Sequence, residues 1–131
     1  MKRRDYLKTI LACGASVAAV SAVAATPNPI VLEVDLAVDP NREKEMLNNF
    51  HTIFKPAAVK FPGYIDVKIL KLRSALMGQA PAGLNYRFQL TYQSEELRQK
   101  WVASDVHQKA WPTIEKTLSS KDYRVLLFDA A

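Results

Sequence analysis

The sequence predicts an α+β domain whose elements follow the order β-α-β-β-α-β. Strand-like stretches are indicated where apolar and polar side chains alternate, which is typical of a strand with one buried face. Two other stretches carry apolar residues at three- and four-residue spacing, which predicts amphipathic helices. The chain has 131 residues, of which 49% are hydrophobic and 24% charged, and this is enough for one globular domain but not two.

The first strand is predicted from Ile30 to Val38. Every second residue in this stretch is apolar, and Glu33 and Asp35 lie between them. Asp39-Pro40 follows, which matches a helix N-cap and a proline at the first helical position. A strand that leads directly into a helix is therefore expected here.

The first helix is predicted from its apolar stripe, which consists of Met46, Leu47, Phe50, Ile53, Phe54, Ala57 and Ala58. Pro56 is expected to kink or loosen the last turn, because proline has no N–H to donate within a helix. Phe61-Pro62-Gly63 is expected to end the helix.

The second half of the domain is expected to hold the remaining three strands and one helix. Strands are predicted over Tyr64–Arg73, Tyr86–Tyr92 and Tyr123–Phe128, with a flexible, glycine- and proline-containing loop over Ser74–Leu84. Ser94 is the predicted cap of the second helix, followed by two glutamates that favour its positive end. A break near Ser104-Asp105 is expected to restart this helix, which would run to about Leu118.

Two helices in this order cover only one face of a four-stranded sheet. The covered face is expected to be the apolar one, which carries Val34, Phe88 and Leu90. The other face would carry Glu33, Asp35, Arg87 and Gln89. A half-covered sheet commonly meets a second copy of itself, and a homodimer is therefore expected.

Residues 1–25 have the pattern of a signal for export. Lys2-Arg3-Arg4 precedes an apolar stretch that ends in Ala22-Val23-Ala24-Ala25, which is typical of a twin-arginine signal peptide. Cleavage after Ala24 or Ala25 would leave a domain over residues 26–131 in the periplasm or outside the cell, with no membrane attachment. Two alternatives are a membrane anchor and a lipoprotein modified at Cys13; the apolar stretch is short for the first, and too few residues precede Cys13 for the second.

Charge and cysteine content exclude several classes of function. The formal charge is +5, but the first eight residues hold four basic residues and one acidic residue, and the remainder holds 14 basic and 12 acidic residues. Such a balance gives no support to nucleic-acid binding. The single cysteine lies in the leader, so the domain itself would have no disulfide, thiolate nucleophile or zinc–cysteine site. The sequence also has no glycine-rich phosphate loop, no metal-ligand spacing and no nucleophile elbow.

Several segments resemble the antibiotic-biosynthesis-monooxygenase-like domains. The main one runs from Tyr92-Gln93-Ser94-Glu95-Glu96 to Ser104-Asp105-Val106-His107-Gln108-Lys109-Ala110-Trp111, and the others are Phe54–Ala58, Pro62-Gly63-Tyr64 and Leu127-Phe128-Asp129. The resemblance covers most of residues 30–129. It implies a ferredoxin-like dimeric α/β barrel with a pocket between the sheet and the helices of each subunit. Several members of that family oxidise polyphenols, quinols or anthrones with molecular oxygen and without metal or flavin.

The haem-degrading branch of the same superfamily uses an asparagine, a tryptophan and a ligating histidine. Trp101 falls at the position of that tryptophan, but Val34 stands at the asparagine position and Trp111 at the histidine position. Haem oxygenation of that type is therefore not expected.

His107 is the candidate catalytic residue. It shares a helical stripe with Ala110, Trp111, Ile114 and Leu118, and an imidazole on an apolar face can serve as a general base near neutral pH. The alternative is a structural histidine that hydrogen-bonds the start of its own helix. Trp101, Trp111 and Tyr92 are candidate substrate-binding walls, although aromatic residues at such spacing also form plain core. His51 is expected at the surface, and Glu33, Asp35 and Arg87 are expected to form a structural ion-pair cluster.

The sequence therefore predicts a cofactor-independent monooxygenase that acts with molecular oxygen on a small quinol- or polyphenol-type aromatic molecule. No cofactor and no metal are expected. The alternatives are a non-catalytic binding protein for a small hydrophobic or haem-like ligand, and a domain with a decayed site that only dimerises.

Overall fold

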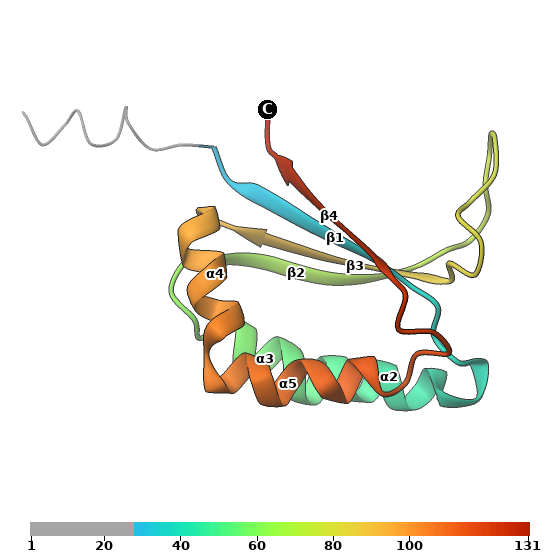
Figure 1. The fold of residues 1–131 in the computed structure, drawn as a ribbon, viewed down its shortest axis with the longest axis horizontal. Coiled ribbons are helices and arrows are strands. Elements are labelled where there is room, and N and C mark those ends of the chain that lie inside the picture. The colour runs from blue at the N-terminus through green and yellow to red at the C-terminus, as the bar shows by residue number, and fades with distance from the viewer. Residues whose placement is uncertain (1–27) are drawn as a thin grey trace, which may run out of the picture.

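Four antiparallel strands form one sheet in the order β2-β3-β1-β4. They are β1 (Ile30–Leu36), β2 (Tyr64–Lys71), β3 (Tyr86–Tyr92) and β4 (Arg124–Asp129). The structure is a computed structural model that describes residues 28–131, so the predicted leader over residues 1–25 lies outside it. All the helices lie against one face of the sheet (Figure 1). The predicted α+β class and the β-α-β-β-α-β order are confirmed.

Strand β1 is shorter than predicted because the chain leaves the sheet after Leu36. Val38 forms an isolated bridge with Leu118 instead, and its backbone N–H and carbonyl both bond the side chain of Asn85 at 2.8 Å. Asn85 thus replaces the missing neighbour strand. Strand β2 likewise ends at Lys71, before the predicted Arg73.

The first helical segment contains four consecutive pieces. They are η2 (Pro40–Arg42), α2 (Glu43–Asn49), the π-helical η3 (Phe50–Phe54) and α3 (Lys55–Ala58). The predicted cap is present, since Oδ1 of Asp39 accepts a hydrogen bond from the Asn41 N–H at 2.9 Å. The π-helical segment ends where the Lys55 N–H donates to the Phe50 carbonyl, one residue before Pro56. The loosening expected around Pro56 therefore takes the form of a π turn on its N-terminal side.

The second helical segment breaks at Ser104, as predicted. It consists of α4 (Glu95–Ala103) and α5 (Asp105–Glu115), and Ser104 between them is extended with ψ 153°. Its side chain accepts a hydrogen bond from the His107 N–H at 3.2 Å and donates to the Trp101 carbonyl at 2.6 Å. Helix α5 ends at Glu115 and not at Leu118, since Leu118 pairs with Val38.

The core lies between the sheet and the helices. Val34, Phe88 and Leu90 are each at most 3% exposed on the covered face, as predicted. The other large buried hydrophobic side chains are Ile30, Leu36, Val38, Met46, Phe50, Phe54, Val67, Tyr86, Tyr92, Trp101 and Ile114. None of the helices over residues 28–131 is long and apolar enough to cross a membrane.

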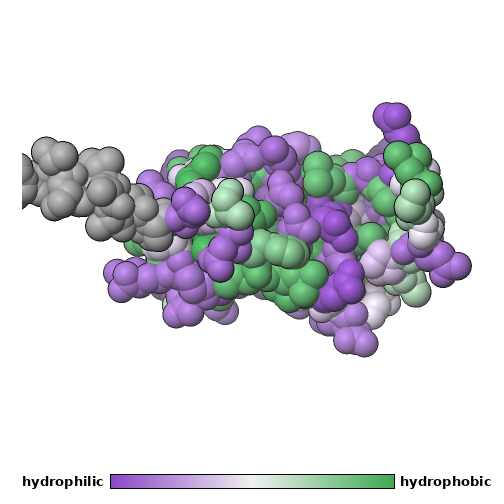
Figure 2. All heavy atoms as spheres, turned by 90° about the horizontal axis from the view of Figure 1, so that it is seen from above, coloured by the Kyte–Doolittle hydropathy of each residue, from purple (hydrophilic) through white to green (hydrophobic). Residues whose placement is uncertain are grey.

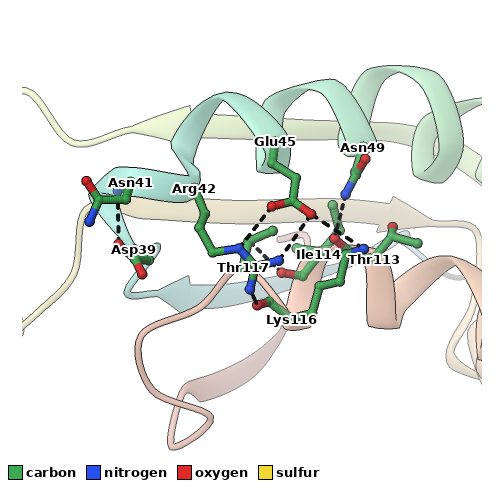
Figure 3. Close-up of polar contacts among 9 residues, drawn as sticks. All are labelled: Asp39, Asn41, Arg42, Glu45, Asn49, Thr113, Ile114, Lys116 and Thr117. Atoms are coloured by element: carbon green, nitrogen blue, oxygen red, sulfur yellow. Dashed lines mark hydrogen bonds and ion pairs between the residues drawn. The ribbon is translucent and has the colours of Figure 1, made fainter.

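Polar contacts join the first helix to the C-terminal end of α5 (Figure 3). The Asn49 amide donates to the Thr113 carbonyl at 2.9 Å, and Lys116 Nζ lies 3.4 Å from Glu45 Oε2. Arg42 binds both Glu45 and the Lys116 carbonyl. These contacts set the position of α5 along the first helix, and with it the position of the side chains that α5 turns toward the sheet.

The uncovered face of the sheet carries an ion-pair cluster. Asp35 is 9% exposed and accepts hydrogen bonds from Arg87 Nε at 2.7 Å and Arg124 Nη2 at 2.7 Å, while Arg87 also lies 3.6 Å from Glu33. Burial alone would raise the pKa of Asp35, but the hydrogen bonds from the two arginines hold that pKa below its ordinary value. The predicted structural cluster is confirmed, with Arg124 as an additional member.

Candidate active site

A cavity of about 200 Å³ lies between the covered face of the sheet and helices α4 and α5. The strands contribute Leu32, Val34, Phe88, Leu90 and Val125 to its lining; the helices and the segment before β4 contribute Phe54, Trp101, Val102, His107, Trp111 and Tyr123. Three of the four sequence-predicted site residues, His107, Trp101 and Trp111, therefore lie around one cavity.

The imidazole of His107 is enclosed by aromatic rings. Its centroid lies 5.1 Å from Trp101 and 6.2 Å from Phe54, both edge-on, and 6.5 Å from the nearly parallel ring of Trp111. Trp101 is completely buried, so it supports the imidazole from within the core. Phe54 belongs to the π turn, which places this ring against the cavity.

The Nδ1 atom of His107 is buried and has no hydrogen-bond partner among the described residues. The alternative role suggested by the sequence, a bond to the start of its own helix, is filled by Ser104, whose hydroxyl caps the His107 backbone N–H. A buried nitrogen without a partner costs about 1–3 kcal/mol of stability. Nδ1 itself has almost no accessible surface, so a ligand in the cavity would meet the other parts of the imidazole, which belongs to the lining.

The surroundings of His107 favour its neutral form. Burial, followed by the positive charge of Arg98, lowers the pKa of His107 from its ordinary value of 6.5. The ring also stands at the third position of α5, close to the positive end of the helix dipole, which acts in the same direction. At neutral pH the imidazole can therefore accept a proton, as a general base must.

Trp111, a predicted wall residue, is hydrogen-bonded to Tyr123, which sequence analysis did not identify as part of the site. The Trp111 indole N–H donates to the Tyr123 hydroxyl at 3.1 Å, and that hydroxyl donates to Oε2 of Glu115 at 2.9 Å. Tyr123 was predicted as the first residue of the last strand, but it lies just before β4, which begins at Arg124. The four consecutive apolar residues 125–128 do not alternate, so the sequence pattern does not show which side of the sheet this end of the chain faces.

Tyr92, which was expected among the pocket walls, does not line this cavity. It is completely buried at the end of β3, with its ring 3.2 Å from the position that a Cβ on Gly63 would take. Its hydroxyl has no partner among the described residues, and burial raises the pKa of Tyr92 to about 12. Leu90 is the last β3 residue of the lining, because Leu97 and the turn at Gly63 close over the sheet beyond it.

The remaining candidate residues lie away from the cavity. His51 is exposed on the first helix, and Glu33, Asp35 and Arg87 lie on the opposite face of the sheet. The loop over residues 74–84 lines two other hollows, one beside Leu70 and one beside Asp35. Within residues 28–131, no group of three or more His, Asp or Glu side chains is arranged to hold a metal ion.

Comparison with protein-family models and with curated proteins gave no match. Solved structures are similar in fold. A dimeric ferredoxin-like protein from Jannaschia sp. CCS1 has a TM-score of 0.66 at 15% identity, over 78% of this chain and 99% of that one. A candidate antibiotic biosynthesis monooxygenase from Caulobacter crescentus has a TM-score of 0.63 at 17% identity, over 81% of this chain and 92% of that one.

Hydroxynitrile lyase from Passiflora edulis is also similar, with a TM-score of 0.66 at 10% identity, over 80% of this chain and 95% of that one. At such identities the likeness shows the ferredoxin-like fold alone. Since monooxygenase-type and lyase-type proteins share this fold, the function has to be argued from the cavity and its imidazole.

Proposed function

We propose that this protein is a cofactor-independent monooxygenase of the antibiotic-biosynthesis type, acting on a small quinol- or polyphenol-type aromatic molecule. The observation that carries the proposal is the imidazole of His107, which lines an apolar, aromatic-walled cavity and whose Nδ1 has no hydrogen-bond partner among the described residues. His107 is the proposed base, and Trp101 and Trp111 are the proposed walls. Candidate antibiotic biosynthesis monooxygenases share the fold, and the chemistry is inferred from the cavity and its imidazole.

The proposed reaction balances without an added reductant. His107 takes the hydroxyl proton of the substrate, and the resulting electron-rich anion reduces molecular oxygen. One oxygen atom enters the ring as a carbonyl and the other leaves as water, whose two hydrogens come from the hydroxyl and from one ring C–H. The substrate loses four electrons and the oxygen molecule gains four. The protein needs only to bind, orient and deprotonate.

The test is oxygen uptake by metal-free protein with a panel of quinols and phenols. Wild-type protein is expected to consume oxygen, and His107→Ala to lose about 10²–10⁴-fold of the rate, which is the usual contribution of a general base. His51→Ala changes an exposed imidazole and serves as the matched control. Absence of uptake by wild type, or unchanged uptake by His107→Ala, would remove the proposed role.

A non-catalytic binding protein for a hydrophobic or haem-like ligand is the competing proposal. The cavity is small for haem, because its volume of about 200 Å³ is below the roughly 300–1,000 Å³ of sites that enclose drug-sized ligands. A Soret band on haem titration, without oxygen uptake, would favour it.

We further propose that the uncovered face of the sheet meets a second copy of the chain. Figure 2 looks onto this face and shows hydrophobic surface beside polar surface. By strand register, Leu126 and Phe128 lie on it, and they are 38% and 47% exposed. Apolar surface of this kind marks an interaction site, and a related fold is dimeric.

Residues 1–25 remain the proposed export signal, which would place the protein in the cell envelope.

A further inference from the structure

The lining of the cavity beside His107 has no ionised side chain. Of the residues within 28–131 that form it, none is Asp, Glu, Lys or Arg. A ligand that carries a carboxylate or phosphate would lose its hydration there and find no countercharge, which is costly in an apolar site. The walls therefore select against charged ligands.

Two of the polar groups at the wall are already engaged with each other. The Trp111 N–H is donated to Tyr123, and the single hydroxyl proton of Tyr123 is donated to Glu115. Burial, together with the bond to Glu115, raises the pKa of Tyr123, although the bond from Trp111 opposes this; the group therefore stays protonated at neutral pH. Both residues thus present ring surface to the cavity and have no proton to give to a ligand.

Only His107, among the residues that line the cavity, can exchange a proton near neutral pH. A neutral imidazole has one nitrogen that donates and one that accepts, and a ligand hydroxyl can pair with either because it can itself donate and accept. One hydroxyl directed at the imidazole would therefore be paired. Apart from the Tyr123 hydroxyl oxygen, which already accepts from Trp111, a second hydroxyl in the same cavity would meet ring carbons and aliphatic side chains.

The size of the cavity limits the ligand further. A cavity of about 150 Å³ holds a benzene molecule, and the cavity here is about 200 Å³. One or two fused rings therefore fit, and larger polycyclic molecules would have to extend out of it.

We propose that the substrate class of this site is an uncharged aromatic molecule of one or two fused rings, with one ionisable hydroxyl bound at the imidazole of His107. This inference rests on the proposed function and narrows it from polyphenols in general to molecules whose buried part is a monohydroxy ring. Any further polar group of the substrate lies outside the cavity, in water.

The experiment compares three naphthalene probes of similar size by tryptophan fluorescence quenching at pH 7 under nitrogen, so that no turnover occurs. They are 1-naphthol, 1-methoxynaphthalene and 1-naphthoate. We expect 1-naphthol to bind, the ether to bind about tenfold more weakly through loss of one hydrogen bond, and the carboxylate to bind about 100-fold more weakly or not at all. In His107→Phe the preference for the hydroxyl over the ether should disappear, and in the control His51→Phe it should persist.

Equal binding of the ether or the carboxylate to wild-type protein would overturn the proposal, and so would the absence of 1-naphthol binding at its solubility limit. Oxygen uptake is measured separately under air. If the selectivity is found without uptake, the substrate class holds for binding and the monooxygenase proposal fails. If uptake is found only with quinols or phenols that also carry a carboxylate, the substrate class fails and the monooxygenase proposal stands.

Discussion

The His107 side chain is stabilised in its neutral form, and this has a consequence for folding. The pKa of the ring is lowered in the folded state by burial and by Arg98, whereas in the unfolded chain it returns to about 6.5. Between these two pKa values the unfolded chain binds the proton and the folded protein does not. The stability that depends on a neutral ring is therefore present above pH 6.5 and is lost as the pH falls through this window.

His107→Gln should accordingly lose less stability than wild type when the pH falls from 7 to 5. Urea unfolding at both pH values measures the difference, and the carboxylates that titrate in the same range are common to both proteins. His51→Gln, at an exposed position, should follow wild type. Equal pH dependence in wild type and His107→Gln would show that the folded state does not favour the neutral ring.

The individual residues around the cavity could be predicted to different extents. His107 and Trp111 share one helical stripe, so their common face follows from spacing alone. Tyr92 alternates with Phe88 and Leu90 along one strand, so the pattern places it on the same face as these two cavity residues. Its exclusion depends on the approach of Leu97 to Gly63, which joins parts of the chain that no local pattern relates. The bond between Trp111 and Tyr123 is missed for the same reason.

Helix α5 depends on its cap at Ser104 for the position of His107. Ser104→Ala removes the hydroxyl that accepts from the His107 N–H, and we expect a loss of about 1 kcal/mol. Ser94→Ala is a matched control, since Ser94 accepts from the Leu97 N–H at the same distance of 3.2 Å at the start of α4. Urea unfolding should show similar losses for both variants. Only Ser104→Ala should weaken 1-naphthol binding, and equal binding by the two variants would contradict a positioning role for this cap.

The turn before β2 is the second local element that can be tested. Gly63 has a φ of +93°, and an added Cβ would lie 2.8 Å from the Leu97 Cβ. Gly63→Ala should therefore lose about 1–2 kcal/mol from its backbone conformation and about 1–3 kcal/mol more from overpacking. Gly78→Ala, with a φ of +72° and no atom within 4 Å, should show the backbone effect alone. Equal losses in thermal or urea unfolding would mean that α4 does not pack tightly on this turn.

The break at Ser104 and the cap at Asp39 were both predictable, because capping depends on residues close in sequence. The bounds of the strands were harder to predict from the sequence. Strand β1 ends early because the side chain of Asn85, 47 residues away in sequence, bonds the backbone N–H and carbonyl of Val38. The bonds of Arg124 to Asp35 similarly depend on the register between β1 and β4, which alternation does not determine.

For the molecule as a whole, the uncovered sheet face predicts association of two chains. Wild-type protein is expected to sediment as a dimer in analytical ultracentrifugation at micromolar concentration. Phe128→Glu places a charge on this face, and this variant is expected to sediment as a monomer. Val59→Glu changes a comparably exposed residue, 44% exposed after α3, and should remain dimeric. A wild-type protein that sediments as a monomer, or a Phe128→Glu variant that remains dimeric, would contradict this interface.

The central claim is that a neutral imidazole in an apolar cavity is available to a ligand hydroxyl. The most direct test is the ¹⁵N NMR spectrum of the His107 ring, recorded as a function of pH and then with 1-naphthol at pH 7. We expect a pKa below 6.5, and a change in the ring nitrogen shifts of His107 on addition of 1-naphthol while those of His51 stay constant. A pKa at or above 6.5 and ring shifts that do not respond to 1-naphthol would contradict the account.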